Sequence, residues 1–404
     1  MADIVIADST GHYDGRYLET HPLGATETSV IYLARALAKR GHSVTVFTHC
    51  DAAIEHEGVH WRPLASTAPG SCDLYVAAQH AELLGFVKAP RRRVIWILWE
   101  PKHLEHAGRI WRMFRYRPTP VFTSAYQVRL YTPQLRPRRP EVGADMRNPP
   151  LAPEPVEPWS HPFRSLRRIV RIGRLRRLLE LGAARVLLPP PEPCVVIPLG
   201  LPDDVRGLPA LAEPPRRQAI FASNPVRNLR RLVEIWATSI LPRVPEAVLD
   251  VYGIHDLGSR NAWQAWEGTL LPSGLPEHVK ASVRLHQTAP RQALIEAMRA
   301  SRVMLYLGHE CEAFCLALAE AQALGVPAVV APVAALPERV IDGVTGFHRG
   351  DPAGFADAAV ALLTDDALWR RQHEACLRER SGIAWPDFAS RFEAAMLGRP
   401  RKKV

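Results

Sequence analysis

The chain has 404 residues, of which 47% are hydrophobic and 23% charged, a composition typical of a globular protein with two or three domains. No apolar stretch reaches the ~20 residues of a membrane helix, and the opening residues 1–15 lack the order of a signal peptide, so we expect a cytoplasmic protein. The net charge of +10 is compatible with nucleic acid or anionic lipid, but most of the 51 basic residues are arginine, which points to biased composition. The six cysteines show no C-x-x-C spacing, so neither a disulfide scaffold nor a zinc site is indicated.

The first half opens as a β-loop-α-β unit. Residues 4–7 predict a strand, residues 26–40 a helix with apolar side chains at helical spacing, and residues 43–48 a second strand. The loop between the first strand and the helix contains Gly24 and Ala25. It lies at the carboxyl end of a strand, where open α/β sheets bind their ligands.

Further strands are predicted at residues 73–78, 94–99 and 121–123. The first of them is followed by His80, and its exit faces the same expected cleft as the loop at Gly24. A neutral imidazole there can donate a hydrogen bond to a ligand hydroxyl or leaving oxygen. The alternative is a surface histidine in a loop, because the chain has 16 histidines.

Residues 133–193 interrupt this pattern and read as an inserted segment rich in proline and arginine. Within it, residues 163–171 place apolar side chains on one helical face and arginines on the other, which suits an anionic membrane surface. Two alternatives stay open: an ordinary covering helix with solvated arginines, and a nucleic-acid contact. No RNA-binding motif and no interleaved aromatic residues accompany the run, which argues against nucleic acid.

The second half repeats the α/β alternation after a strand at residues 195–197 and a proline-rich linker at residues 203–216. Its expected strands and helices alternate as in a doubly wound sheet. The strands are residues 218–222, 247–252, 283–286, 303–307 and 328–331, with a helix at residues 291–300. The first strand runs into a turn before the next helix, and this turn contains Ser223, Asn224 and Arg227.

Two glutamates with seven residues between them are the most informative feature of the chain. Residues 308–312 read as a loop and residues 314–324 as a helix, which places Glu312 at the helix N-terminus and Glu320 roughly 12 Å further along the axis. The free N–H groups of a helix N-terminus favour phosphate oxygens, so the arrangement suits a nucleotide-sugar. The alternative is the solvated side of an amphipathic helix. Glu320 is flanked by alanines and leucines, however, and a carboxylate on such a helix needs a partner.

The run E-A-F-C-L-A-L-A-E-A that starts at Glu312 resembles E-G-F-G-L-x-x-x-E-A, the donor-site signature of the retaining GT-B glycosyltransferases of family 4, glycosyl transferases group 1. The resemblance implies that Glu312 contacts the transferred sugar and that Glu320 holds the ribose hydroxyls. Ala313, Phe314 and Cys315 then belong to the donor loop, with Ala313 and Cys315 in place of two glycines.

Three other segments resemble the same family. Gly24 and Ala25 stand where it has the two glycines of G-G-x-E, in a loop that admits acceptor or phosphate, and His80 matches a histidine near the sugar. Arg227 takes a lysine-like position that offsets the charge of the departing diphosphate. The other basic residue of that turn is missing, so the resemblance leaves hydrogen bonding to the diphosphate to Ser223 and Asn224.

The resemblance implies a GT-B fold, an α/β class with two Rossmann-like doubly wound parallel-sheet domains that face a cleft. Its domains would be residues 1–202 with the insertion, residues 203–384 for the donor, and residues 385–404, in which a helix at residues 385–397 crosses back to the first domain and a basic tail follows. The implied reaction moves a sugar from a nucleotide-diphosphate sugar to a hydroxyl with retention, without a cofactor and without a metal.

Three further expectations concern partners. The hydroxyl acceptor would be lipid-linked or a polysaccharide, the protein would contact an anionic membrane peripherally at the inner surface, and no nucleic acid is expected. The alternative to an active enzyme is a GT-B-shaped binding or scaffold protein without turnover, which the replaced glycines and the missing basic residue suggest.

Overall fold

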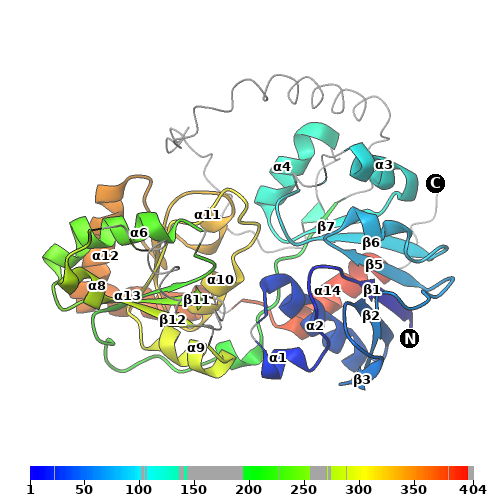
Figure 1. Cartoon of the computed structure of the whole chain (residues 1–404), viewed down its shortest axis with the longest axis horizontal. Coiled ribbons are helices and arrows are strands. Elements are labelled where there is room, and N and C mark those ends of the chain that lie inside the picture. Colours follow the sequence, from blue (N-terminus) through cyan, green and yellow to red (C-terminus); the bar gives the residue numbers. More distant parts are fainter. Residues whose placement is uncertain are drawn as a thin grey trace. The chain divides into compact units, whose positions relative to one another are not determined.

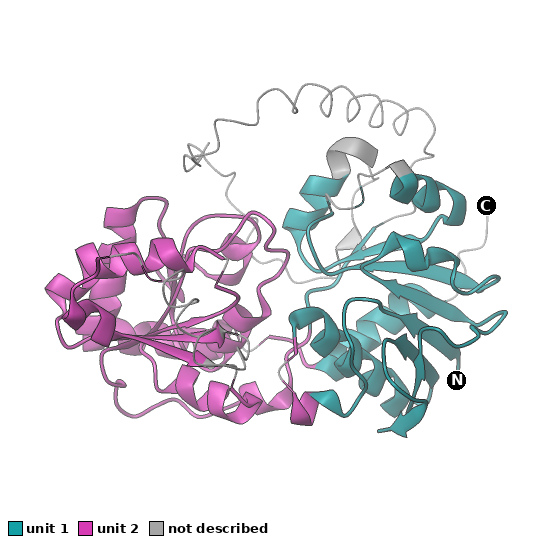
Figure 2. Ribbon diagram, viewed as in Figure 1, with its two compact units in different colours: residues 1–17, 24–199, 385–404 teal, residues 18–23, 200–384 magenta. Residues whose placement is uncertain are grey.

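The computed structural model describes residues 1–21, 23–101, 104, 107–135, 141–142, 194–225, 227–254, 271, 274–287, 289–380 and 382–398. The arginine-rich helix predicted at residues 163–171 and nearly all of the predicted insertion lie outside these ranges. The chain forms two compact units (Figure 2). The first comprises Met1–Tyr17, Gly24–Leu199 and Trp385–Val404, and the second comprises Leu18–Leu23 and Gly200–Ala384.

The first unit is built on a sheet of nine strands in the order β3-β4-β2-β1-β5-β6-β7-β9-β8. All neighbouring strands are parallel except β3 and β4, which pair as an antiparallel hairpin. The strands are β1 (Asp3–Ala7), β2 (Ser43–Thr48), β3 (Ile54–His56), β4 (Val59–Pro63), β5 (Leu74–Ala78), β6 (Arg92–Ile97), β7 (Thr119–Phe122), β8 (Glu141–Val142) and β9 (Val195–Val196). The inner strands β1, β5 and β6 are almost entirely buried, as expected for a parallel sheet covered on both faces.

The helices around this sheet are α1 (Tyr17–Thr20), which runs into the second unit, α2 (Ala25–Lys39), α3 (Ala107–Tyr116), α4 (Ala125–Leu135) and α14 (Trp385–Leu397). The C-terminal helix α14 lies beside α2 (Figure 1). Trp385 stacks on Tyr32 with ring centroids 5.6 Å apart, and Arg40 binds Glu393 at 2.6 Å. These contacts explain why the last helix belongs to the first unit.

The second unit contains a six-stranded, all-parallel sheet in the order β12-β11-β10-β13-β14-β15. Its strands are β10 (Gln218–Ala222), β11 (Val248–Ile254), β12 (Val283–Gln287), β13 (Val303–Tyr306), β14 (Ala328–Val330) and β15 (Gly346–His348). The helices are α6 (Leu229–Ile235), α8 (Glu277–Ser282), α9 (Arg291–Arg299), α10 (Leu316–Ala323), α11 (Leu336–Arg339), α12 (Pro352–Thr364) and α13 (Asp366–Glu379). One hydrophobic core joins this sheet to its helices, with Trp236 and Phe355 among its largest buried side chains.

The residues that begin and end the long segment of the second unit, Gly200–Ala384, lie together. Leu201 donates its N–H to the carbonyl of Ile383 at 2.8 Å and forms an isolated bridge with Ala384. Gly382 packs so closely on Leu201 that a Cβ on it would lie 2.5 Å from the leucine side chain. The start of the second unit and its end are therefore tied to each other.

Local periodicity predicted most of these elements within one to three residues. The strands β2 and β10 and the helix α14 have the predicted bounds. One boundary that matters is wrong, because the helix predicted at residues 314–324 begins only at Leu316. Hydrophobic periodicity did not predict the hairpin of β3 and β4 or the edge strand β15, because these strands are only three to five residues long.

Candidate functional site

The strand order of the second unit creates a topological switch point between β10 and β13. From β10 the chain winds outward through β11 and β12, then returns to the other side of β10 with β13. Open α/β sheets bind ligands at the carboxyl ends of strands at such a point. Ser223 follows β10 and Tyr306 ends β13, and their hydroxyl oxygens lie 3.2 Å apart. The two strand ends that flank the switch point are thus joined by a hydrogen bond.

Glu312 is placed at this switch point by a turn, in which its N–H binds the carbonyl of His309 at 3.0 Å. Its side chain is 9% exposed, which excludes the solvated-face interpretation. The Oε1 atom accepts hydrogen bonds from the Tyr306 hydroxyl and from Arg227 Nη1. Oε2 makes no hydrogen bond to the described part of the chain.

Arg227 reaches Glu312 from the turn that follows β10. Its N–H binds the carbonyl of Asn224 at 2.9 Å, which closes the turn before α6. The next residue, Asn228, donates its side-chain amide to the carbonyl of Gly308 at 2.6 Å. The turn after β10 and the loop after β13 are therefore linked by the ion pair of Arg227 with Glu312 and by the hydrogen bond from the Asn228 side chain to the Gly308 carbonyl. The structure brings together the predicted residues Ser223, Asn224, Arg227 and Glu312 at one edge of the sheet.

Glu320 lies on α10 with its side chain 8% exposed. Its Oε1 accepts from Arg291 Nη1 at 2.9 Å, and Arg291 also binds Asp204 through Nε at 2.6 Å and Nη2 at 2.8 Å. Burial raises the pKa of Glu320 above its usual range, and Arg291 partly offsets that effect. The sequence predicted that the Glu320 carboxylate needs a partner on this apolar helix. The structure shows that this partner is the Arg291 guanidinium.

Three residues other than glycine near Glu312 have a backbone conformation that glycine usually adopts. Cys315 has φ of 62°, Ala334 has φ of 55° and Asn228 has φ of 64°, all in the left-handed region. Such a conformation is costly for residues other than glycine, asparagine and aspartate, and residues held in it cluster at functional sites. Because Cys315 interrupts the helical path, α10 starts after it, and Glu312 lies in the preceding loop rather than at the helix terminus.

The two residues between Glu312 and Cys315 are buried and build the wall of this loop. Ala313 is 5% exposed and Phe314 is 4% exposed. The guanidinium of Arg339 lies 4.3 Å above the Phe314 ring, a cation–π contact that fixes the ring. These side chains shape the loop from the inside, whereas Glu312 is the residue whose carboxylate reaches the switch point.

The corresponding switch point of the first unit lies between β1 and β5. Gly24 is the N-cap of α2 and Ala25 is its first residue, one position before the predicted start. A Cβ at Gly24 would lie 2.6 Å from Oε2 of Glu27, whose carboxylate turns back to the helix start. Burial raises the pKa of Glu27, and the nearby Asp8 adds to the shift. A side chain at Gly24 would therefore displace the Glu27 carboxylate, whereas the Gly24 backbone, with φ of −72°, is one that any residue adopts.

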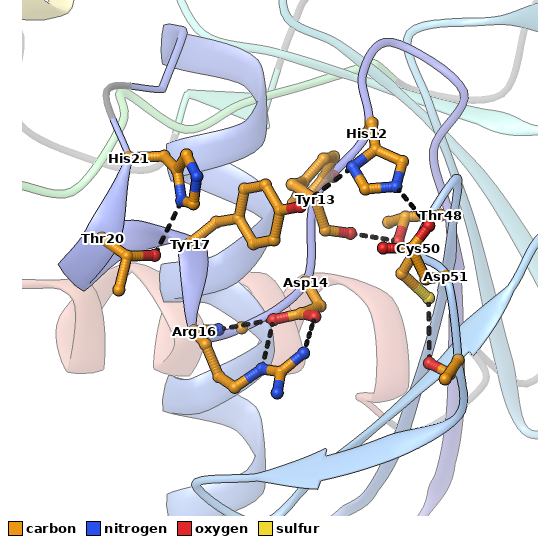
Figure 3. A network of polar contacts seen from close by, with 12 residues as sticks. His12, Tyr13, Asp14, Arg16, Tyr17, Thr20, His21, Thr48, Cys50 and Asp51 are labelled. Carbon is orange, nitrogen blue, oxygen red and sulfur yellow. Dashed lines mark hydrogen bonds and ion pairs between the residues drawn. The ribbon is translucent and has the colours of Figure 1, made fainter.

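His80 follows β5 in the same unit and is half-buried. Its ring meets Trp99 edge-on, with centroids 5.7 Å apart, and the Trp99 indole donates to the Thr26 hydroxyl at 2.9 Å. The loop after β1 is held by another network (Figure 3). There the His12 ring lies 3.0 Å from the Tyr17 hydroxyl and 2.9 Å from an oxygen of Asp51. Gly24, Ala25 and His80 thus belong to the first unit, whereas the other predicted site residues belong to the second.

Sequence reasoning missed three residues of the second-unit site. Tyr306 stands in a predicted strand, where an aromatic residue is read as core. Arg291 opens a predicted helix and Asp204 lies in the predicted linker, far from Glu320 in sequence. These residues are far apart in the sequence, so no motif links them. The one signal was that a buried Glu320 carboxylate needs a cation, which indicates an arginine or lysine from another segment.

The part of the chain that the structure describes contains no group of three or more histidine, cysteine, aspartate or glutamate side chains that could hold a metal ion. Within the same ranges, every helix is too short or too polar to span a bilayer.

Comparison with known proteins assigns the class of the second unit. Residues 217–365 match the family described as Glycosyl transferases group 1. This range contains Ser223, Arg227, Tyr306, Glu312 and Glu320. The second unit therefore carries a glycosyl transferases group 1 domain, which confirms the family resemblance predicted from the sequence.

Curated relatives support the same family over shorter stretches. D-inositol 3-phosphate glycosyltransferase of Thermobifida fusca is 32% identical over 191 residues, which cover 46% of this chain and 41% of that protein. N-acetyl-alpha-D-glucosaminyl L-malate synthase of Bacillus anthracis is 42% identical over 81 residues, or 20% of this chain and 21% of that protein. The matches thus span less than half the length of these relatives.

Solved structures match nearly the whole chain. Sucrose-phosphate synthase from Thermosynechococcus elongatus aligns with a TM-score of 0.63 and 16% identity, covering 98% of both chains. Anabaena HepE in complex with UDP-glucose gives a TM-score of 0.60 and 13% identity, covering 98% of this chain and 99% of that one. WaaG, a glycosyltransferase involved in lipopolysaccharide biosynthesis, also gives 0.60 at 13% identity, covering 98% and 100%. At these identities the comparison shows the fold, which is GT-B.

Proposed function

We propose that this protein is a glycosyltransferase that moves a sugar from a nucleotide-diphosphate sugar to a hydroxyl acceptor with retention of anomeric configuration. The observation that carries the proposal is the pair of buried glutamates in the matching domain, each held through Oε1 by its own arginine. Burying two carboxylates costs stability unless they are paired, and neither belongs to the hydrophobic core. Binding of a nucleotide-sugar donor by both carboxylates would explain why the domain contains two buried glutamates.

The second unit offers each part of such a donor a partner. Glu320 accepts hydrogen bonds from the ribose hydroxyls, and Glu312 accepts one from the transferred sugar. Arg227 turns to the diphosphate, where a guanidinium binds phosphate oxygens and offsets the charge that grows as the glycosidic bond breaks. In this proposal, charge neutralisation comes from Arg227 and backbone N–H groups, so that no metal ion is needed.

The donor assignment is tested by thermal-shift binding to UDP, GDP, ADP, TDP and CMP sugars, because a ligand that binds only the folded state raises its melting temperature. We expect one nucleotide to raise the melting temperature selectively. The Glu320→Ala variant should lose that response, while the Glu234→Ala variant, on the exposed side of α6, should keep it. An unchanged response of Glu320→Ala would contradict the assigned site.

The acceptor side belongs to the first unit in this proposal, with His80 as a donor to the sugar or leaving oxygen. The acceptor would be lipid-linked or a polysaccharide, and one surface of the first unit favours a peripheral position at the inner surface of an anionic membrane. On α3, Trp111 is 59% exposed and its ring lies 5.6 Å from that of Phe114. Arg115 is exposed one turn after Trp111 on the same helix, and the exposed Arg117 follows just beyond the helix end. Tryptophan with arginine on one helix face is typical of the membrane interface.

Vesicle binding tests this surface. The unmodified protein should sediment with vesicles of phosphatidylglycerol and not with phosphatidylcholine, and Trp111→Ala should weaken the binding. Trp99→Ala removes another exposed tryptophan of the same unit and should not. If the protein binds vesicles but no nucleotide-sugar, the alternative of an inactive GT-B-shaped scaffold at a membrane surface replaces the enzyme proposal.

A further inference from the structure

Two hydrogen-bond donors converge on one oxygen of the buried Glu312 carboxylate. The Tyr306 hydroxyl and Arg227 Nη1 both bind Oε1, although the carboxylate has a second oxygen. The two donors differ in mobility: the Arg227 side chain is 31% exposed and ends a long flexible stem, whereas Tyr306 is fully buried. One partner of Glu312 can therefore leave, and the other cannot.

Tyr306 is fixed from several sides. Its ring packs against Phe221 of β10, with centroids 5.7 Å apart. The only hydroxyl proton of Tyr306 goes to Glu312, so the Ser223 hydroxyl, 3.2 Å away, must donate to the tyrosine oxygen. Burial and the neighbouring Glu312 raise the pKa of Tyr306 well above its usual range. The tyrosine therefore stays protonated, and remains a donor, at neutral pH.

Arg227 has two competing anions if a nucleotide-diphosphate sugar binds. In the structure it neutralises Glu312, and in the proposed function it neutralises the diphosphate. When the diphosphate takes the guanidinium, a carboxylate that is only 9% exposed loses its cation. A buried carboxylate without any donor is strongly unfavourable. Some other group must keep Glu312 satisfied while Arg227 is engaged.

We propose that Tyr306 is a positioning residue that holds Oε1 of Glu312 while Arg227 passes to the donor diphosphate, which leaves Oε2 for a sugar hydroxyl. Donor binding then exchanges one partner of Glu312 and retains the other. The inference rests on the proposed function, since it needs a nucleotide diphosphate at this site. It assigns a role to a residue outside the family signature.

A double-mutant cycle tests the exchange, with calorimetric binding of UDP, GDP and ADP as the measurement. We expect Tyr306→Phe to weaken binding of the preferred nucleotide by at least about tenfold, because a hydrogen bond to a buried charge contributes that much. In the Glu312→Ala background the arginine is already free, so the same substitution should change the affinity less than about twofold. An effect of Tyr306→Phe that depends on Glu312 shows that Tyr306 acts through the Glu312 carboxylate, whereas a general loss of stability would weaken binding equally in both backgrounds.

Two further variants keep the test decisive. Ser223→Ala removes the hydrogen bond that orients Tyr306 and should weaken nucleotide binding in a Glu312-dependent manner, even if Tyr306→Phe does not fold. Tyr75→Phe is the matched control, since this fully buried tyrosine of the first unit donates to the carbonyl of Leu83 at 2.5 Å. It should lower the melting temperature without changing nucleotide affinity.

The outcomes are distinguishable. Weakening by Tyr306→Phe that is equal with and without Glu312, or no weakening at all, overturns the positioning role and leaves the proposed function standing. If the unmodified protein binds none of the three nucleotides and none of the UDP, GDP, ADP, TDP and CMP sugars of the thermal-shift test, the proposed function fails and this inference fails with it.

Discussion

Arg291 binds Glu320 with Nη1 2.9 Å from Oε1, and it uses its other two nitrogens for Asp204. One guanidinium thus joins α9, α10 and the segment that enters the second unit. The buried glutamate is compensated by a cation that comes from a different helix. The contact is therefore a structural requirement of the second unit as well as part of the candidate site.

Arg291→Met should lower the free energy of unfolding by about 2–3 kcal/mol. Removing one partner of a buried pair leaves an uncompensated charge, which costs about 3–5 kcal/mol when burial is complete, and the Arg291 side chain is 25% exposed. Urea denaturation provides the measurement. Arg243→Met, which breaks an exposed pair with Asp357, should stay within about 1 kcal/mol of the unmodified protein. Equal effects of the two variants would contradict the role given to Arg291.

The stability difference between the unmodified protein and Glu320→Gln should depend on pH. Burial raises the pKa of Glu320 in the folded protein, so the folded state binds its proton more tightly than the unfolded state. The contribution of Glu320 to stability is then greatest below the usual pKa of 4.5 and falls as pH rises through the folded value. Denaturation of both proteins between pH 4 and pH 8 measures the difference. A difference that grows with pH would show that Arg291 outweighs burial.

Ala334→Gly should stabilise the protein by about 0.5–1 kcal/mol. Ala334 has φ of 55°, and the left-handed cost of alanine exceeds the extra chain entropy that glycine loses on folding. Ala361, also half-buried, lies inside α12, and Ala361→Gly should destabilise by a similar amount. A higher melting temperature for Ala334→Gly and a lower one for Ala361→Gly would support backbone strain at Ala334. Destabilisation by both variants would count against it.

Gly253→Ala should cost more than about 3 kcal/mol and disturb the switch point. A Cβ at this position would lie 2.2 Å from the carbonyl oxygen of Ser223, and both atoms belong to backbones that cannot separate without breaking the sheet. Gly207 also has a positive φ but no atom within 4 Å of its Cβ position. Gly207→Ala should therefore cost only about 1 kcal/mol. Comparable losses in the two variants would mean that backbone conformation, and not the close approach, sets the cost.

Most of the fold could be predicted because the pattern of apolar residues within each strand and helix is visible in the local sequence. The runs at residues 43–48, 218–222 and 385–397 gave the bounds that the structure has, since hydrophobic periodicity and helix signals act within a few residues. The start of α10 could not be predicted in this way. Cysteine is not a residue that signals a left-handed turn, so the local pattern predicts a helix that continues through Cys315.

The sequence by itself determined the alternation of the two α/β halves and the spacing of Glu312 and Glu320. Both depend on neighbours along the chain. The tertiary structure decided which groups satisfy those glutamates: Arg227 lies 85 residues from Glu312, Arg291 lies 29 residues from Glu320, and Asp204 lies 87 residues from Arg291. Strand order brings such residues to one edge of the sheet, and a buried carboxylate tolerates no arrangement that leaves it without a donor.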